Sequence, residues 1–301
     1  MDVRGNALEI PLAVLKEFGR DVSANLFLAS EIPPGTGLGS SASVCVNLLK
    51  TLASYCHVDL SKYELAERAF HVARHVLGRP VGKQDEYASA FGGLNFISFH
   101  PDGTTLVEPL CLESELIREL QSSLLLFFTG ASHHSWTILQ EQEESAQKQR
   151  SAAVEYLHEI RRLADSMKSA LIKGALRDFA SLLHEGWEVK KQLSCKISSV
   201  RINELYEAAM QNGALGGKIT GAGGGGFLLL FCPQIRQRNV RDAMTALGAR
   251  EMGFEFEFQG AQVVANDPFI DRDENGGARW TFAPISNDSS VPRPVAARGS
   301  A

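Results

Sequence analysis

The stretch that decides the fold is PPGTGLGSSA, residues 33–42. It follows an apolar segment, Asn25–Ser30, that predicts a strand, and it leads into Ser41–Tyr55, whose apolar spacing predicts a helix. Its glycines permit backbone conformations closed to other residues and let N–H groups approach a ligand closely. Because a helix N-terminus also attracts anions, the stretch predicts a phosphate-binding loop made of Pro34, Gly35, Thr36, Gly37, Leu38, Gly39, Ser40, Ser41 and Ala42.

This loop differs from the two best-known glycine-rich loops. It lacks the Gly-Lys-Ser/Thr ending of a P-loop, and its glycine spacing is not that of the dinucleotide-binding fingerprint. A strand–helix turn without a ligand is the alternative for a short Gly-x-Gly, but the length of this string favours a ligand. A serine hydroxyl at the start of such a helix, here Ser41, can ligate Mg²⁺.

A second glycine run, Gly216–Gly226, precedes the apolar strand Phe227–Phe231. So many glycines cost conformational entropy on folding, so a close backbone approach must compensate. A bound ligand and tight helix–strand packing both satisfy that requirement, and the residues alone leave the two open. Lys218 within the run is likewise open to two interpretations, an exposed lysine or a lysine that faces an anionic substrate group.

A third candidate is the carboxylate of Asp85, with Lys83 close to it in GKQDEY. Phosphoryl transfer needs a group that orients or deprotonates the attacking hydroxyl, and a carboxylate beside a lysine on a short connecting segment could serve. Taken alone, such a pair is more often a solvated surface pair. Lys190 and Lys191 are interpreted in the same way, as a solvated helix face, with substrate phosphate as the sharper option.

These stretches together resemble one family. Residues 33–42 resemble motif 2 of the GHMP kinases, and residues 216–226 resemble their motif 3. The segment GKQDEYASAFGGLNFISF, residues 82–99, is similar to the corresponding segment of sugar kinases in that family, above all to the heptose 7-phosphate kinase group. The resemblance extends over about residues 20–260.

The resemblance implies roles for these residues. It makes Asp85 the catalytic base and Ser41 a ligand of Mg²⁺, with ATP held by the first glycine loop. It also implies which residues lie near the phosphates or near the substrate: Lys83, Gly221, Ala222, Gly223 and Gly224. The implied reaction is ATP-dependent phosphorylation of a sugar or sugar phosphate, at the anomeric hydroxyl of heptose 7-phosphate. Another sugar, such as fucose or galactose, and a catalytically impaired nucleotide-binding homologue are the alternatives.

The implied fold is α+β with two lobes. Residues 1–115 would form an N-terminal lobe like domain 2 of ribosomal protein S5, and residues 116–265 a ferredoxin-like C-terminal lobe. Residues 266–301, rich in Asp, Asn, Gly, Pro and Ser, predict a flexible tail. Two departures from the family stand out: motif 1 has no counterpart before residue 33, so we expect a truncated N-terminal lobe, and Ala73 stands where the family usually has a metal-binding Glu.

The composition limits the partners. A net charge of −5 and a pI of about 5.9 give no broad basic surface for nucleic acid. No apolar run is long enough to cross a bilayer, and the scattered cysteines suit a reducing compartment, so we expect a cytoplasmic protein with a small-molecule partner. A homodimer is left open.

The remaining elements follow from capping and periodicity. Ser61 and Glu64 predict a capping box that opens a helix, and Gly78 predicts its end. His133 and His134 are interpreted as surface histidines. Helices are predicted over 135–173, 176–193, 200–211 and 240–247, and strands over 94–99, 123–128 and 254–258.

Overall fold

The computed structural model describes residues 8–19, 22, 24–32, 35–130, 150–264, 271–272 and 278–279. The chain divides into two compact units at Val263 and Val264. In the second unit the described residues form only a short antiparallel pair, β7 (Asp271–Arg272) and β8 (Ala278–Arg279). The predicted flexible tail therefore lies almost wholly outside the described residues, as do His133 and His134.

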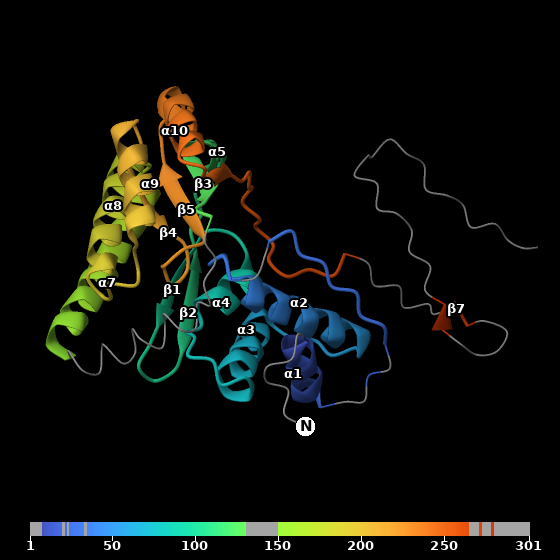
Figure 1. Ribbon diagram of the computed structural model, residues 1–301. Coiled ribbons are helices and arrows are strands. Elements are labelled where there is room, and N and C mark those ends of the chain that lie inside the picture. Colours follow the sequence, from blue (N-terminus) through green and yellow to red (C-terminus); the bar gives the residue numbers. More distant parts are fainter. Residues whose placement is uncertain are drawn as a thin grey trace, which may run out of the picture. The chain divides into compact units, whose positions relative to one another are not determined.

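The N-terminal half of the first unit is a helical layer with one hairpin (Figure 1). Its elements are α1 (Glu9–Phe18), α2 (Ser40–Tyr55), α3 (Lys62–His71), the π-helical turn η1 (Val72–Val76), α4 (Gln84–Phe91), β1 (Asn95–Phe99) and β2 (Thr105–Pro109). The helices bury one shared core that includes Val46, Leu49, Leu65 and Tyr87. The predicted capping box is confirmed, since Ser61 and Glu64 bond each other's backbone N–H groups at the start of α3.

The predicted strand over Asn25–Ser30 is wrong. These residues have no ladder partner among the described strands, and they run as an irregular segment. Their apolar side chains are exposed, with Phe27 at 92%. Apolar composition alone cannot make a strand, because strand geometry is held by hydrogen bonds to a neighbour.

The C-terminal half is an antiparallel sheet covered by helices. The strands are β3 (Leu124–Phe128), β4 (Gly216–Ile219), β5 (Phe227–Phe231) and β6 (Arg250–Glu251), in the order β4-β5-β3-β6. The helices are α5 (Ser114–Ser123), α7 (Arg150–Ile172), α8 (Leu176–Lys191), α9 (Val200–Gln211) and α10 (Gln234–Ala246). Helices α7 and α8 lie side by side, and α8 packs on β4 (Figure 1). The mixture of helices and antiparallel strands confirms the α+β prediction.

Two further element predictions need correction. Helix α10 begins at Gln234, not Val240, because Pro233 with φ −55° at the N-cap starts the helix directly after β5. Residues 254–257 alternate in exposure, but residues 254–258 form no strand, since the Phe256 N–H donates to the Gln121 side chain at 3.0 Å instead of to a ladder. The predicted helix over 135–173 is described only from Arg150 onward.

No helix in the described part of the chain combines the length and hydropathy that a membrane span requires.

Candidate active site

The first glycine loop ends at the N-terminus of α2. Gly35, Gly37 and Gly39 have φ of +76°, +78° and +68°, the left-handed region that glycine adopts without strain. Gly39 is the N-cap residue and provides no side-chain cap, so no cap hydroxyl or carboxylate occupies the first N–H groups of α2. Such groups, together with the helix dipole, are suited to phosphate oxygens. Pro34 lies outside the described residues.

The two glycine loops pack directly against each other. A Cβ atom at Gly37 would lie 2.7 Å from the carbonyl oxygen of Thr220, and one at Gly221 would lie 2.7 Å from the Cα atom of Gly37. A Cβ atom at Gly226 would overlap the carbonyl oxygen of Thr36. Tight packing between backbones therefore accounts for these glycines, and it brings motifs far apart in the sequence to one place.

The second loop is anchored to the sheet at several points. The Gly224 N–H donates to the Ile197 carbonyl at 2.8 Å, and the Thr220 N–H donates to the Phe227 carbonyl at 2.9 Å. At the end of β3, both the N–H and the hydroxyl of Thr129 donate to the Gly226 carbonyl at 2.9 Å. Gly221, Ala222, Gly223 and Gly224 therefore sit in a loop of fixed position next to the first glycine loop.

Asp85 lies against the first loop. It is the second residue of α4, so the expectation of a short connecting segment is wrong: residues 84–91 are helical. A Cβ atom at Gly39 would lie 3.4 Å from the Asp85 Cβ and Cγ atoms and 3.5 Å from Oδ2. The hydroxyls of Ser43 on α2 and Ser89 on α4 are 3.0 Å apart and hydrogen bond the two helices together. Burial raises the pKa of Asp85, and the charge of Lys190 opposes that rise.

Lys190 is a site residue that the sequence interpretation placed on a solvated helix face, with substrate phosphate as the alternative. Its Nζ, in the last turn of α8, donates to the Gly221 carbonyl at 2.5 Å. Desolvation and the charge of Lys218 lower the pKa of Lys190 to about 7, and Asp85 works against that lowering. Spacing on α8 does not separate the two lysines, because Lys190 and Lys191 are three and four residues from the buried Trp187 and both lie on its side of the helix. Lys191 instead pairs with Glu188 at 2.7 Å.

Lys218 points toward the same helix. Side chains alternate along β4, so Lys218 shares a face with Gly216, and a Cβ atom at Gly216 would overlap the Ala180 carbonyl of α8. Burial lowers the pKa of Lys218. Within the part of the chain that the structure describes, its ammonium has no hydrogen bond or ion pair. This geometry disfavours the interpretation of Lys218 as an exposed lysine.

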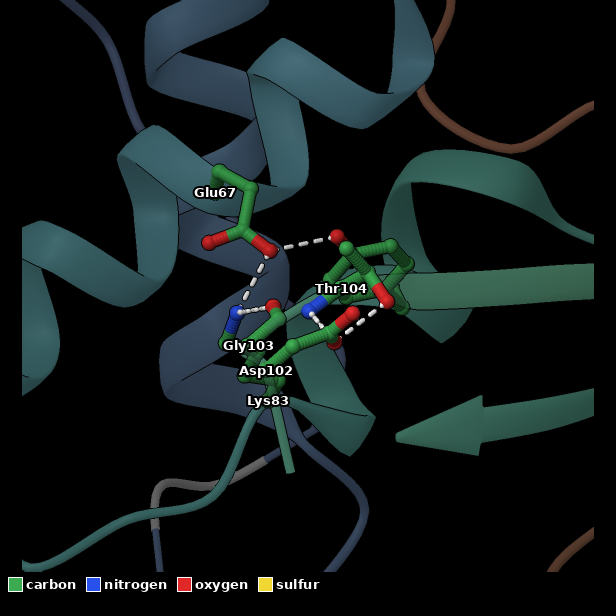
Figure 2. A network of polar contacts seen from close by, with 6 residues as sticks. Glu67, Lys83, Asp102, Gly103 and Thr104 are labelled. Carbon is green, nitrogen blue, oxygen red and sulfur yellow. Dashed lines mark hydrogen bonds and ion pairs between the residues drawn. The ribbon is translucent and has the colours of Figure 1, made fainter. Parts of the chain in front are cut away.

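Lys83 has a different set of contacts (Figure 2). Its Nζ donates to Glu67 Oε1 at 2.7 Å and to the Gly103 carbonyl at 3.2 Å, and Glu67 also accepts a 2.5 Å hydrogen bond from the Tyr87 hydroxyl. Figure 2 shows this network next to the β1–β2 turn, where Asp102 bonds Thr104. The described contacts of the Lys83 ammonium are therefore with Glu67, the turn and the Phe70 ring, and none is with the glycine loops.

Two further positions bear on metal binding. Ala73 lies in η1, and its carbonyl accepts a hydrogen bond from the Arg79 N–H, so this position has a backbone role and no carboxylate. Glu86 is 3% exposed, and burial raises its pKa to about 7. Its Oε2 has no partner among the described residues. Across those residues, no group of three or more His, Cys, Asp or Glu side chains is arranged to hold a metal.

Comparisons with known proteins match both halves of the chain. Residues 6–93 match the N-terminal domain of GHMP kinases, and residues 167–250 match their C-terminal domain. The chain is 31% identical over 250 residues to the D-glycero-alpha-D-manno-heptose 7-phosphate kinase of Campylobacter jejuni, covering 83% of this chain and 73% of that one. It is 28% identical over 218 residues to the bifunctional fucokinase/GDP-fucose pyrophosphorylase of Arabidopsis thaliana, covering 69% and 20%.

Among solved structures, the chain is similar to a D-glycero-D-manno-heptose 1-phosphate kinase from Bacteroides thetaiotaomicron. The two share 32% identity with a TM-score of 0.61 over 76% of this chain. The match spans 64% of that protein, which is less than two thirds of its length.

Proposed function

This chain belongs to the GHMP kinase family, and on that premise we propose that it transfers a phosphoryl group from ATP to a hydroxyl of a sugar or sugar phosphate. One observation carries the proposal: the N-terminus of α2, the Asp85 carboxylate and the second glycine loop converge. A Cβ atom at Gly39 would lie 3.4 Å from the Asp85 side chain, and one at Gly221 would lie 2.7 Å from the Cα atom of Gly37. Phosphoryl transfer depends mainly on positioning and charge stabilisation, which such a convergence supplies.

The first loop and the start of α2 would bind the triphosphate. The N–H groups of Gly35–Ala42 and the α2 dipole favour negative charge at this end of the helix. Ser41 at the start of α2 offers a hydroxyl to Mg²⁺, and the remaining ligands would be ATP oxygens and water. When bound, Mg²⁺ neutralises charge on the phosphate oxygens. No carboxylate cluster is required for this arrangement, so the residues present fit a metal that arrives with ATP.

Asp85 would orient and deprotonate the attacking hydroxyl. Its side chain is partly buried beside the helix N-terminus, and burial raises the pKa of Asp85, which makes the carboxylate a stronger base. The neighbouring Lys190 charge limits that rise. This pair of effects suits a base that must accept a proton and release it afterwards.

For the acceptor we propose the anomeric hydroxyl of D-glycero-D-manno-heptose 7-phosphate. This follows from similarity to the Campylobacter jejuni kinase, whose name states that substrate. A reducing cytoplasm is the proposed location, in keeping with five cysteines that are all free.

The test is ADP release from ATP with a panel of acceptors: heptose 7-phosphate, the unphosphorylated heptose, fucose and galactose. We expect turnover with heptose 7-phosphate, and no turnover above background for Asp85→Asn. Preference for fucose or galactose would change the acceptor and keep the kinase. The proposal would be contradicted if the protein phosphorylated none of the acceptors in the panel.

A second candidate is nucleotide binding without turnover, which Ala73 favours. A methyl group stands where the family usually supplies a metal-binding carboxylate, and its surroundings in η1 provide no replacement on the same turn. Calorimetric titration with ATP and Mg²⁺ beside the turnover assay separates the candidates. Binding without turnover, with turnover gained in Ala73→Glu, would favour this second candidate.

A further inference from the structure

We infer that Lys190 and Lys218 form a two-lysine site for a phosphate group at the reaction centre. The inference rests on the proposed function and deepens it, because it assigns residues of the C-terminal half to an anion that the glycine loops alone do not hold. The shared chemistry is a phosphate with free anionic oxygens, either the γ-phosphate of ATP or the phosphate of a phosphorylated acceptor.

The geometry places Lys190 at the junction of all three parts of the site. Its Nζ bonds the Gly221 carbonyl at 2.5 Å, and Gly221 packs on Gly37 of the first loop. Lys190 also interacts electrostatically with Asp85, whose carboxylate lies against Gly39. An ammonium group carries three N–H donors. Within the described part of the chain, the hydrogen bond to the Gly221 carbonyl uses one of these donors and leaves two for oxygens bound between the loops.

The charge balance of this cluster favours an anion. Among the described residues, Asp85 is the one acidic group whose charge acts on Lys190, and the Lys218 ammonium acts on Lys190 in the opposite sense. Both lysines are partly buried, burial lowers the pKa of each, and Lys218 has no partner among the described residues. Holding two unbalanced, desolvated ammonium groups close together costs free energy. A bound phosphate would remove that cost by supplying negative charge and acceptor oxygens.

The neighbouring Lys191 provides a matched comparison. It lies on the same turn of α8, but its Nζ pairs with Glu188 at 2.7 Å and lies 5.9 Å from the centre of the Trp187 ring. Its charge is therefore already balanced. Replacing Lys191 with Met removes the same charge and a similar volume from the same helix without touching the loops, so it controls for net charge and for helix stability.

The experiment measures binding by calorimetry for the wild type, Lys190→Met, Lys218→Met and Lys191→Met. The probes are ATP, ADP, tripolyphosphate, the phosphorylated sugar and the same sugar without phosphate. We expect each site variant to weaken at least one phosphate ligand about tenfold or more, the usual worth of a charge-assisted hydrogen bond. Lys191→Met should bind every probe as the wild type does.

The pattern of loss identifies the source of the phosphate. Weaker ATP and tripolyphosphate binding with ADP unchanged assigns the site to the γ-phosphate. Weaker binding of the phosphorylated sugar alone, with the plain sugar unchanged, assigns it to the acceptor. If Lys190→Met and Lys218→Met bind all phosphate probes as tightly as Lys191→Met, the inference is overturned.

Failure of the proposed function gives a different result. Wild-type protein that binds tripolyphosphate through Lys190 and Lys218 but transfers no phosphoryl group would refute the kinase proposal and leave the two-lysine site standing. Lys190→Arg guards against misfolding, because it keeps the positive charge: it should retain most phosphate binding, and each variant's thermal unfolding is measured alongside.

Discussion

Lys83 and Lys190 stand in opposite relations to Asp85. Lys83 is two residues from it in the chain, yet its ammonium bonds Glu67 and the β1–β2 turn. Lys190 is distant in the chain, yet it interacts with Asp85 and bonds the Gly221 carbonyl beside it. The difference comes from α4: residues two apart on a helix point to nearly opposite sides. Proximity in sequence was therefore a poor guide to which lysine serves the site.

The largest effect is expected at the Asp85 carboxylate itself. Asp85→Asn should lower kcat by roughly 10²–10⁴-fold, because a general base typically contributes that much. ATP affinity should stay close to the wild-type value, since the amide fits the same space against Gly39. Steady-state turnover and calorimetry on the same preparation provide the check, and an unchanged kcat would remove Asp85 from its proposed role.

Glu86 follows Asp85 on α4, but its carboxylate is expected to affect the stability of the folded state instead of catalysis. Burial raises the pKa of Glu86 to about 7 in the folded state. The free-energy cost of ionising Glu86 in the folded state is therefore absent below the unfolded pKa, grows as the pH rises toward 7, and is fully present above it. Wild-type stability should therefore fall between about pH 4.5 and 7 from this group. Glu86→Gln should remove that fall and gain on the order of 3 kcal/mol at pH 8.

Urea unfolding of wild type and Glu86→Gln at pH 4.5 and pH 8 measures the difference. Nearly equal stabilities at the lower pH and a more stable variant at the higher pH are the expected result. A variant that is less stable at pH 8 would mean that the carboxylate has a stabilising partner.

Lys190→Met should lower kcat/KM by about 10–100-fold, the usual cost of losing a charge-assisted contact to a phosphate. Burial and Lys218 lower the pKa of Lys190 to about 7. Below that pH the ammonium is charged and phosphate affinity is highest, and affinity should weaken as the pH rises and Lys190 loses its proton. Lys190→Arg stays charged, so its affinity should not show this loss between pH 7 and 9. Identical pH profiles for the two proteins would contradict the assignment.

The smallest effect is expected at Lys83. Lys83→Met removes a partly exposed ion pair with Glu67, which is worth about 1 kcal/mol or less. Turnover should remain within about twofold of the wild type, since the described contacts of Lys83 do not reach the glycine loops. A loss of activity comparable to that of Lys190→Met would restore the substrate role that the sequence implied for Lys83 and undo the comparison.

Helices and buried strands were predictable where local pattern and tertiary packing agree. The helix Val200–Gln211 and the strand Phe227–Phe231 have the predicted bounds, because one has helical apolar spacing and the other is apolar throughout. The capping box of Ser61 and Glu64 is a local hydrogen-bond pattern and was equally legible. Asn25–Ser30 failed for the opposite reason, since a strand depends on a partner that its own residues do not encode.

The site divides in the same way. The amino-acid sequence by itself determined the family, the two glycine loops and the choice of Asp85, because these rest on residue types in a fixed local order. Only the tertiary structure decided that the loops pack through Gly37 and Gly221, that Lys83 pairs with Glu67, and that Lys218 and Asp85 both lie near Lys190. Charge–charge relations depend on distance in space and on burial, and neither is written in the order of residues along the chain.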